Sequence, residues 1–306
     1  MSRWTKTAIR RSRMSPAHLI WFVTLGCFWG LSPSLYKLMG EAGLPISQII
    51  TFTGFGVALG MGAIPLLRTG RIIVSRQVAL FTFVCAILMN IPFTLSLLFS
   101  RHVAATEYAL IASTAPFWNY FVALATRREN ASARRFLAVA VGFVSSAVLI
   151  ISRGAFTGDI SLWVIGCFIV PVVYCAYNWF AARFWPAGGD IMVIGTMESL
   201  FCGILGIPFM LYFAPPWGET ALPLWDYWPA IIATAMWTIE RIAFFSLIRD
   251  RGAVYTIQAI YVSTPAAVLW AIVIFGGGTD IWLWTSLAIL MVALWLNNSG
   301  RLAKAA

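Results

Sequence analysis

The sequence predicts an all-α integral membrane protein with ten transmembrane helices, and three observations lead to this fold class. The chain of 306 residues is 60% hydrophobic and only 10% charged, whereas an ordinary soluble domain carries about 25% charged residues. Its mean hydropathy of +0.84 leaves too little polar surface to cover a soluble core. Its apolar residues also form continuous runs of about 20, the length of a membrane-crossing helix, rather than the alternation of a membrane β-barrel.

Short segments with glycine, proline or charged residues, such as "GEAGLP" and "RRENASARR", separate the apolar runs. Connections this short predict that successive helices are antiparallel and closely packed. The first run is too long for a signal peptide and leads directly into further spans. The predicted spans are 18–39, 46–67, 77–99, 103–126, 135–152, 160–182, 190–213, 228–248, 253–275 and 281–299.

Basic residues gather in alternate loops. One side of the membrane holds the five basic residues of the tail 1–17 together with Arg68, Arg71, Arg76, Arg127, Arg128, Arg134, Arg135, Arg183, Arg249, Arg251, Arg301 and Lys304. The other side holds only Arg101 and Arg153, with the acidic Glu41, Asp159, Glu219, Asp226 and Asp280. The positive-inside rule then places both termini in the cytoplasm. We expect the chain to lie in the cell inner membrane. The net charge of +10 therefore reflects orientation and not nucleic-acid binding.

Two parts of the sequence resemble each other. "SRHVAATEYALIASTAPFWNYFVALA" and "RDRGAVYTIQAIYVSTPAAVLWAIVI" align when Pro116 is placed on Pro265, a separation of 149 residues. Five spans in each half is an odd number, so the halves 18–152 and 160–299 are predicted to have opposite orientations, followed by a short tail at 300–306. Inverted repeats of this kind are typical of secondary transporters, whose substrate site lies between the halves.

Prolines and glycines within the spans predict both hinges and close helix contacts. Pro33, Pro116 and Pro265 each remove a backbone hydrogen bond and are candidate hinges. Prolines are also commoner in membrane helices in general, which is the alternative explanation. Gly56 and Gly60 form a GxxxG motif that predicts close helix packing.

The segment "FWGLSPSLYK", the repeated proline-bearing helix and "ALATRRENASARRFLAVAVGFVSSAVLI" resemble the drug/metabolite transporter superfamily. The resemblance spans the whole chain, is to the EamA-type members, and is strongest to the aromatic amino-acid exporters. It implies a central cavity formed mainly by the first, third, fourth, sixth, eighth and ninth spans, and export of small amphipathic metabolites. The sequence departs from a symmetric pattern at Glu129, whose counterpart is Gly278, with Asp280 two positions on.

Polar and aromatic residues recur at helical spacing within several spans. Intramembrane polar groups usually face the interior of a bundle or a water-filled route. The predicted cavity residues are Asn90, Thr94, Trp118, Tyr174, Asn178, Trp237, Glu240, Arg241, Gln258 and Tyr261. Hydrogen bonding between helices is the alternative for the two asparagines, and core packing is the alternative for the aromatic residues.

Glu240 and Arg241 are adjacent charges near the middle of a span. Neighbouring side chains on a helix point about 100° apart, so the two charges do not simply neutralise each other. At least one of them must face another helix or the cavity. Arg241 shares a face with Trp237, an arrangement suited to a carboxylate beside an aromatic ring. Whether Glu107, Glu198 and Glu240 are structural or functional stays open at this stage.

These features favour transport of an amino acid with a large apolar side chain, since a zwitterion needs both an acceptor and a donor. Export of drugs or cationic dyes is the alternative, and a membrane-embedded transferase is a remote one. We expect no metal site, because the cysteines and histidines show no ligand spacing. We also expect no enzyme activity and no cofactor, because the sequence shows no paired carboxylates, no histidine cluster and no nucleophile with a nearby base. A phosphate-binding GxxxxGK[ST] motif is absent from the sequence, which argues against ATP as a direct energy source. A monomer is expected, and proton coupling and facilitated movement are both open.

Overall fold

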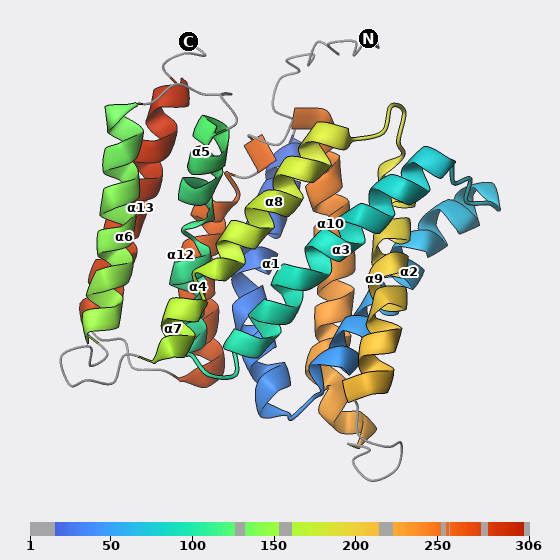
Figure 1. Cartoon of the computed structure of the whole chain (residues 1–306), viewed down its shortest axis with the longest axis horizontal. Helices are drawn as coiled ribbons and strands as arrows, with labels where there is room; N and C mark the ends of the chain where they lie inside the picture. Colours follow the sequence, from blue (N-terminus) through green and yellow to red (C-terminus); the bar gives the residue numbers. More distant parts are fainter. Residues whose placement is uncertain are drawn as a thin grey trace.

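The computed structural model describes residues 16–125, 132–152, 161–213, 223–251, 255–256, 258–276 and 281–302 (Figure 1). In these ranges the regular secondary structure is helical and contains no strand, which confirms the predicted all-α class. Six helical segments are long and apolar enough to cross a membrane. The chain is therefore a multi-pass membrane protein. Most of the predicted N-terminal tail, and with it Glu129, Arg153, Gly278 and Asp280, lies outside the described residues.

The helices before residue 153 are α1 (Pro16–Glu41), α2 (Ile46–Thr69), α3 (Arg76–Phe99), α4 (Ala105–Ala112), α5 (Ala115–Ala125) and α6 (Ala133–Ser152). Local sequence fixes several of their ends. Gly70 ends α2 in the left-handed region at φ 69°, where its N–H donates to the Leu66 carbonyl. The Ser75 side chain accepts from the Val78 N–H and so caps the start of α3.

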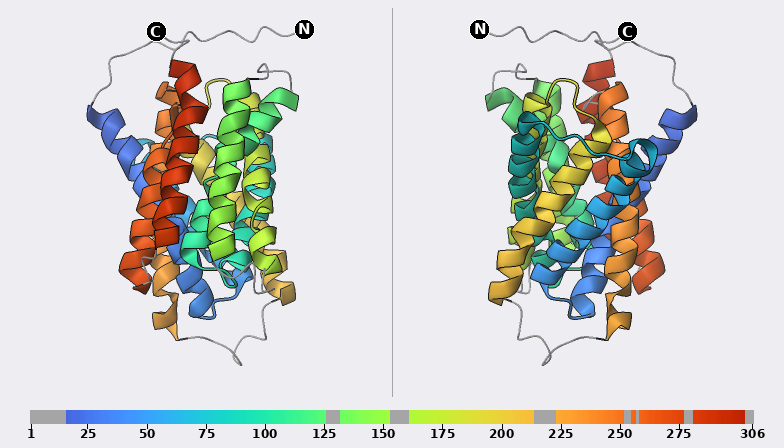
Figure 2. Two further views of the ribbon diagram at one scale, coloured as in Figure 1. Left: turned by 90° about the vertical axis from the view of Figure 1, so that its left-hand side faces the viewer. Right: turned by 90° about the vertical axis from the view of Figure 1, so that its right-hand side faces the viewer.

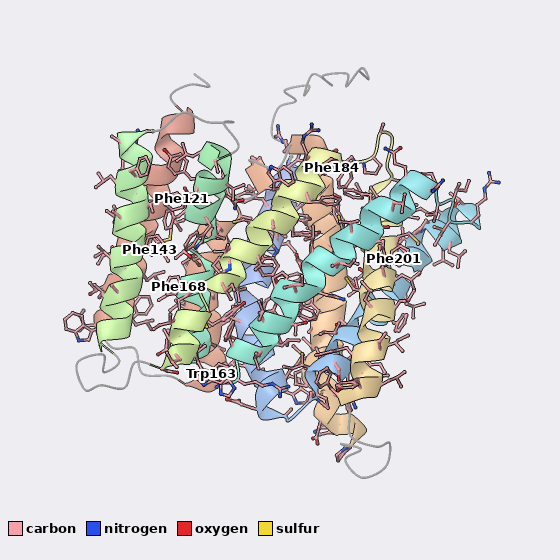
Figure 3. All side chains as sticks on the ribbon, viewed as in Figure 1. Phe121, Phe143, Trp163, Phe168, Phe184 and Phe201 are labelled. Carbon is pink, nitrogen blue, oxygen red and sulfur yellow. The ribbon has the colours of Figure 1, made fainter. Side chains whose placement is uncertain are left out.

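The later helices are α7 (Leu162–Gly166), α8 (Ile169–Phe184), α9 (Ile191–Phe213), the 3₁₀ turn η2 (Leu224–Tyr227), α10 (Trp228–Arg251), α12 (Ile260–Phe275) and α13 (Ile281–Leu302). Their outer surfaces are covered by apolar side chains (Figure 3). Tyr212 is 81% exposed and Leu67 in α2 is 86% exposed. Large apolar side chains in such exposed positions are suited to contact with lipid.

Three of the predicted spans are interrupted in the structure. The span 103–126 is divided into α4 and α5, because the chain turns at Ser113 and Thr114 just before Pro116. The span 160–182 is divided into α7 and α8, with Pro171 in the first turn of α8. The span 253–275 contains a turn at residues 258–259 before α12 begins. Proline is tolerated in the first turn of a helix, where no hydrogen bond is lost, so the first two breaks fall where proline favours them.

Helix pairs that are distant in sequence form the framework. α2 packs along α9, and α6 packs along α13 at the opposite end of the molecule (Figures 1 and 2). Between these pairs, α1 contacts α10 and α12, while α3 contacts α8 and α9. α5 contacts α8, and α10 contacts α2.

Glycines allow α2 to approach its neighbours closely. A Cβ atom placed on Gly54 would lie 2.5 Å from the backbone nitrogen of Gly203 in α9. A Cβ atom on Gly60 would lie 2.8 Å from the Thr238 methyl group in α10, and Gly56 is similarly covered by Thr234. The close packing predicted from the GxxxG motif is thus confirmed, and α10 is the helix against which it packs.

α6 and α13 are joined by a reciprocal hydrogen-bonded pair of buried serines. The Ser145 hydroxyl lies 2.7 Å from the Ser286 carbonyl oxygen, and the Ser286 hydroxyl lies 2.8 Å from the Ser145 carbonyl oxygen. Small hydroxyl residues of this kind let membrane helices approach and satisfy their own polar groups. The pair fixes the register of α6 against α13.

Candidate functional site

A cavity of about 270 Å³ lies between the helices. Its walls come from α1, α2, α3, α4, α5, α8, α9, α10 and α12. Its polar and aromatic side chains include Trp29, Ser32, Tyr36, Asn90, Phe93, Tyr108, Tyr174, Asn178, Ser199, Cys202, Trp237, Glu240 and Arg241. Trp29, Asn90 and Glu240 fall near the midpoints of their helices. The cavity is therefore deep within the apolar bundle.

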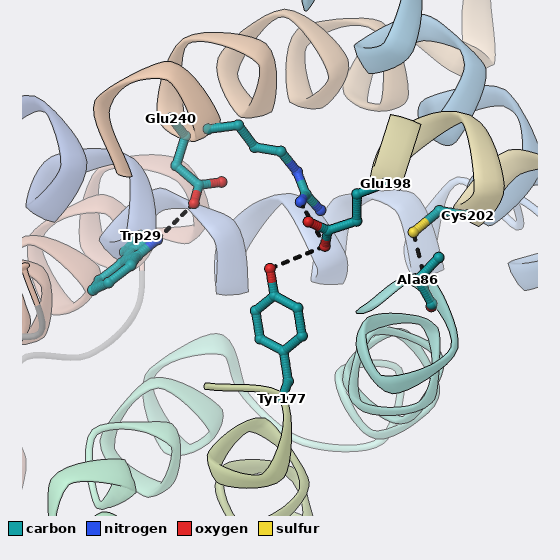
Figure 4. Close-up of polar contacts among 7 residues, drawn as sticks. Trp29, Ala86, Tyr177, Glu198, Cys202 and Glu240 are labelled. Atoms are coloured by element: carbon teal, nitrogen blue, oxygen red, sulfur yellow. Dashed lines mark hydrogen bonds and ion pairs between the residues drawn. The ribbon is translucent and has the colours of Figure 1, made fainter. Parts of the chain in front are cut away.

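An ion pair stands beside this cavity. Arg241 Nη1 of α10 lies 2.9 Å from Oε1 of Glu198 in α9, and the Tyr177 hydroxyl of α8 donates to the same oxygen at 2.9 Å (Figure 4). Glu198 is only 1% exposed. Both a cation and a hydrogen-bond donor therefore stabilise this buried carboxylate, as its desolvation requires.

Glu240 turns toward a different helix from its neighbour Arg241. Its Oε1 atom accepts a hydrogen bond from the indole N–H of Trp29 in α1 at 2.7 Å (Figure 4). Arg241 is thus paired with a residue of α9 and Glu240 with a residue of α1. This agrees with the prediction that the two adjacent charges do not simply neutralise each other.

Aromatic rings form one wall of the cavity. The ring centroid of Trp237 lies 5.2 Å from that of Phe93 and 5.9 Å from that of Tyr36. The Trp237 indole N–H donates to the Ser32 hydroxyl at 3.2 Å. Tyr108 completes the group, with its ring 6.1 Å from Tyr36. These edge and tilted contacts are the favourable arrangements for aromatic pairs.

Three uncharged polar side chains also reach the cavity. Asn90 donates to the Cys202 carbonyl at 3.1 Å and so links α3 to α9 while lining the cavity. Asn178 of α8 lines the cavity as well. The Ser199 hydroxyl is buried in the wall, and no hydrogen-bond partner is found for it among the described residues. A buried polar group without a partner is costly to the fold.

Of the predicted cavity residues, the structure places six on the cavity wall: Asn90, Tyr174, Asn178, Trp237, Glu240 and Arg241. The predicted hinge residue Pro33 also lines it and lies within an unbroken α1. The other two predicted hinges differ in setting, since Pro116 follows the α4–α5 break and Pro265 lies inside α12.

The other four predicted cavity residues do not line the cavity. The Thr94 hydroxyl bonds back to the Asn90 carbonyl of its own helix at 2.7 Å. Trp118 packs against Phe121 and Phe143, because the break at Ser113 and Thr114 rotates α5 away from the face of α4. The Tyr261 hydroxyl donates to the Leu294 carbonyl of α13. Gln258 stands in the turn before α12, outside the cavity wall.

Sequence reasoning missed several residues of this site. Tyr36, Tyr177 and Ser199 carry no signal of their own, since tyrosine and serine are common within membrane helices. Glu198 was identifiable as a charge within an apolar run, but its partner on another helix was not. Glu107 is explained locally, because its carboxylate accepts from the Ala104 N–H at the start of α4 at 3.1 Å.

A basic loop residue links two helix connections at one end of the bundle. The guanidinium of Arg101, which follows α3, donates to the Leu44 carbonyl between α1 and α2. Lys37 of α1 donates in turn to the Arg101 carbonyl at 3.4 Å. Burial lowers the pKa of Arg101. This contact links the α1–α2 connection to the α3–α4 connection.

Comparison with known proteins shows the fold alone. No family model matches the chain, and no curated protein matches it. Among 25 matching chains of solved structures is one described only as "Crystal structure of protein", with a TM-score of 0.61 and 13% identity. The match covers 92% of this chain and 97% of the other. At this identity the match shows a shared overall fold.

Proposed function

We propose that the chain is a secondary transporter that moves small organic molecules across the cell inner membrane by alternating access. The observation that carries this proposal is the cavity deep within an apolar bundle, where Glu240 and Arg241 meet aromatic side chains. Charged groups at such depth are costly and usually mark a substrate or ion pathway. The proposal includes membership of the EamA-type drug/metabolite transporters, as the sequence resemblance implies, and no enzymatic activity.

The packing of the helices supports two inverted five-helix halves. If the halves are related by symmetry, each span corresponds to the span five places later in the chain. The contacts of α1 with α10 and α12 then correspond to the contacts of α8 with α3 and α5, and all four of these contacts occur. The pairs α2–α9 and α6–α13 map onto themselves. Gly54 and Gly203, which touch between α2 and α9, are separated by the same 149 residues as Pro116 and Pro265. A two-fold axis in the membrane plane would produce this pattern.

Ten spans follow if the interrupted segments are counted as single crossings. On this basis each interrupted span crosses the membrane once. These spans are α4 with α5, α7 with α8, and α12 with the turn before it. Discontinuous helices are a recurring feature of transporters, where they surround the substrate site. The breaks also provide positions at which the halves can change their mutual angle.

An aromatic or large apolar amino acid is the substrate that the sequence resemblance favours. The rings of Tyr36, Phe93 and Trp237 offer an apolar surface for an indole or phenyl group. A drug or cationic dye is the second candidate, and Glu240 in the cavity wall specifically favours it.

Flux into liposomes tests the function. Purified protein is reconstituted, and uptake of labelled tryptophan, phenylalanine and alanine is measured with and without a pH gradient, beside a fluorescent organic cation. We expect saturable flux of at least one compound with a ring, exceeding that of alanine. Acceleration by the gradient would indicate proton coupling. Absence of saturable flux for every compound would contradict the proposal.

A tryptophan pair supplies the control. Trp237→Ala removes a ring from the cavity wall and should lower the flux severalfold. Trp225→Ala removes a ring that is 81% exposed on η2 and should leave the flux near the wild-type value.

A further inference from the structure

We propose that the cavity selects organic monocations over zwitterions, with the ammonium group of the ligand held by Glu240. This inference rests on the proposed transport function, and it names the substrate class for the same cavity. It separates the two candidates that the fold leaves in competition, because an amine and an amino acid with the same ring differ only in a carboxylate.

The first step is that the positive charge of Arg241 is already compensated. Glu198, at 2.9 Å, is buried behind the guanidinium and receives a second hydrogen bond from Tyr177. A ligand carboxylate that approached Arg241 would have to compete with a carboxylate built into the protein. Separating that pair would leave Glu198 as a buried, unpaired charge, which is strongly unfavourable.

The second step is that Glu240 has no hydrogen-bonded cation of its own, because the adjacent Arg241, which also acts on it electrostatically, is ion-paired with Glu198. The hydrogen-bond donor found for its carboxylate among the described residues is the neutral indole N–H of Trp29. A neutral donor stabilises a carboxylate but does not cancel its charge. Glu198 and Glu240 together bring two negative charges and Arg241 brings one positive charge, so these three groups leave one negative charge when all are ionised. A ligand with a single positive charge neutralises it, whereas a zwitterion does not.

The third step is the shape of the wall around Glu240. Trp29 contacts the carboxylate directly, and the rings of Tyr36 and Trp237 line the same cavity. Aromatic faces attract ammonium groups through their quadrupoles and also bury apolar ligand surface. At about 270 Å³ the cavity suits a ligand with one or two rings.

Titration calorimetry on the purified full chain at pH 7 tests the inference with matched ligands. Tryptamine is a monocation at this pH and tryptophan is a zwitterion with the same indole. We expect tryptamine to bind at least tenfold more tightly than tryptophan. Glu240→Gln should lower tryptamine binding at least tenfold and abolish the preference. Glu41→Gln makes the same chemical change at an exposed position at the end of α1 and should leave the preference intact.

A second variant reverses the charge balance. Glu198→Gln removes the carboxylate that neutralises Arg241, so Arg241 can bind the carboxylate of tryptophan. Tryptophan binding should strengthen by about tenfold, and the preference for tryptamine over tryptophan should shrink or reverse. Wild-type protein that binds tryptophan as tightly as tryptamine, or fails to bind tryptamine, would overturn the inference. So would a folded Glu240→Gln protein that keeps the preference.

Liposome flux of both ligands distinguishes this inference from the transport proposal. A permanently charged N,N,N-trimethyl derivative of tryptamine avoids passive leakage of the neutral amine. Selective binding of the amines without carrier-mediated flux of any compound would support the selectivity and contradict the transport function. Flux of tryptophan, with tryptamine bound no more tightly, would support transport and overturn the selectivity.

Discussion

At the level of single residues, the buried ion pair between Glu198 and Arg241 joins α9 to α10 in the wall of the cavity. Arg241→Ala should lower the stability by about 3–5 kcal/mol, because it leaves a carboxylate that is 1% exposed without its cation. Replacing both partners together, as Glu198→Leu with Arg241→Met, should recover most of this loss. Thermal unfolding in detergent compares the three proteins. A double variant less stable than Arg241→Ala would contradict this explanation. It would show that Glu198 and Arg241 stabilise the fold by more than neutralising each other's charge.

Tyr177 provides a second test at this scale. Tyr177→Phe removes the hydroxyl that donates to Glu198 while keeping the ring. A hydrogen bond to a charged group contributes about 1.5–3 kcal/mol, so a measurable drop in the unfolding temperature is expected. The control is Tyr212→Phe, which removes a hydroxyl from a side chain 81% exposed and should change the unfolding temperature little. Equal effects of the two variants would contradict the buried network.

The sequence identified the charges of this site but not their partners. Glu198, Glu240 and Arg241 stand out because charges in apolar runs are rare. Their partners Tyr177 and Trp29 come from other helices, and no local rule relates residues so far apart in the chain. Periodicity placed six of ten predicted residues on the wall, and it failed for Trp118 because the helix is broken between the residues being compared.

At the level of helices, the contact between α2 and α9 depends on the absence of side chains at Gly54 and Gly203. Gly54→Ala would place a Cβ atom 2.5 Å from a backbone nitrogen that cannot move independently. We expect a loss of about 1–3 kcal/mol, as is usual for overpacking, measured by thermal unfolding. Leu59→Ala on the same helix alters a side chain that is 76% exposed and should have a much smaller effect. A Gly54→Ala protein as stable as Leu59→Ala would show that the helices can separate freely.

Helix boundaries were predictable, whereas helix breaks were not. Hydropathy alone gave α1, α2 and α3 to within a few residues, because membrane thickness fixes their length. Proline by itself does not tell a break from a tolerated kink. Pro33 sits inside an unbroken α1, whereas Pro116 and Pro171 follow breaks. Pro116 and Pro171 lie in the first turn of the helix that follows each break, where no backbone hydrogen bond is lost.

At the level of the whole molecule, the composition was sufficient to predict a helical membrane protein, because a chain with 60% hydrophobic residues has few other ways to satisfy its backbone in lipid. The location of the cavity required the tertiary structure, since its walls come from nine helices that are far apart in the sequence. The internal repeat gave only the expectation that a site lies between the halves.

The Arg101 contact leads to the prediction that it restricts access to the cavity from one end of the bundle. Arg101 binds the Leu44 carbonyl and thereby holds the α1–α2 connection against the α3–α4 connection. Cys202 lines the cavity and is a natural reporter, once Cys27, Cys85, Cys167 and Cys175 are replaced by alanine. In this background, Arg101→Ala should increase severalfold the rate at which a membrane-impermeant thiol reagent, added on the Arg101 side, modifies Cys202.

The matched control for access is Arg76→Ala, which removes an exposed arginine at the start of α3 and should leave the rate unchanged. Unfolding temperature is measured in parallel, so that general loosening can be distinguished from opening of one end. Reagent added on the opposite side should modify Cys202 no faster after Arg101→Ala, because the proposed alternating access would expose the cavity to one side at a time. An equal increase from both sides would mean that Arg101 holds the bundle together rather than closing one end. An unchanged rate would place the barrier to Cys202 deeper, among the aromatic side chains around Trp237.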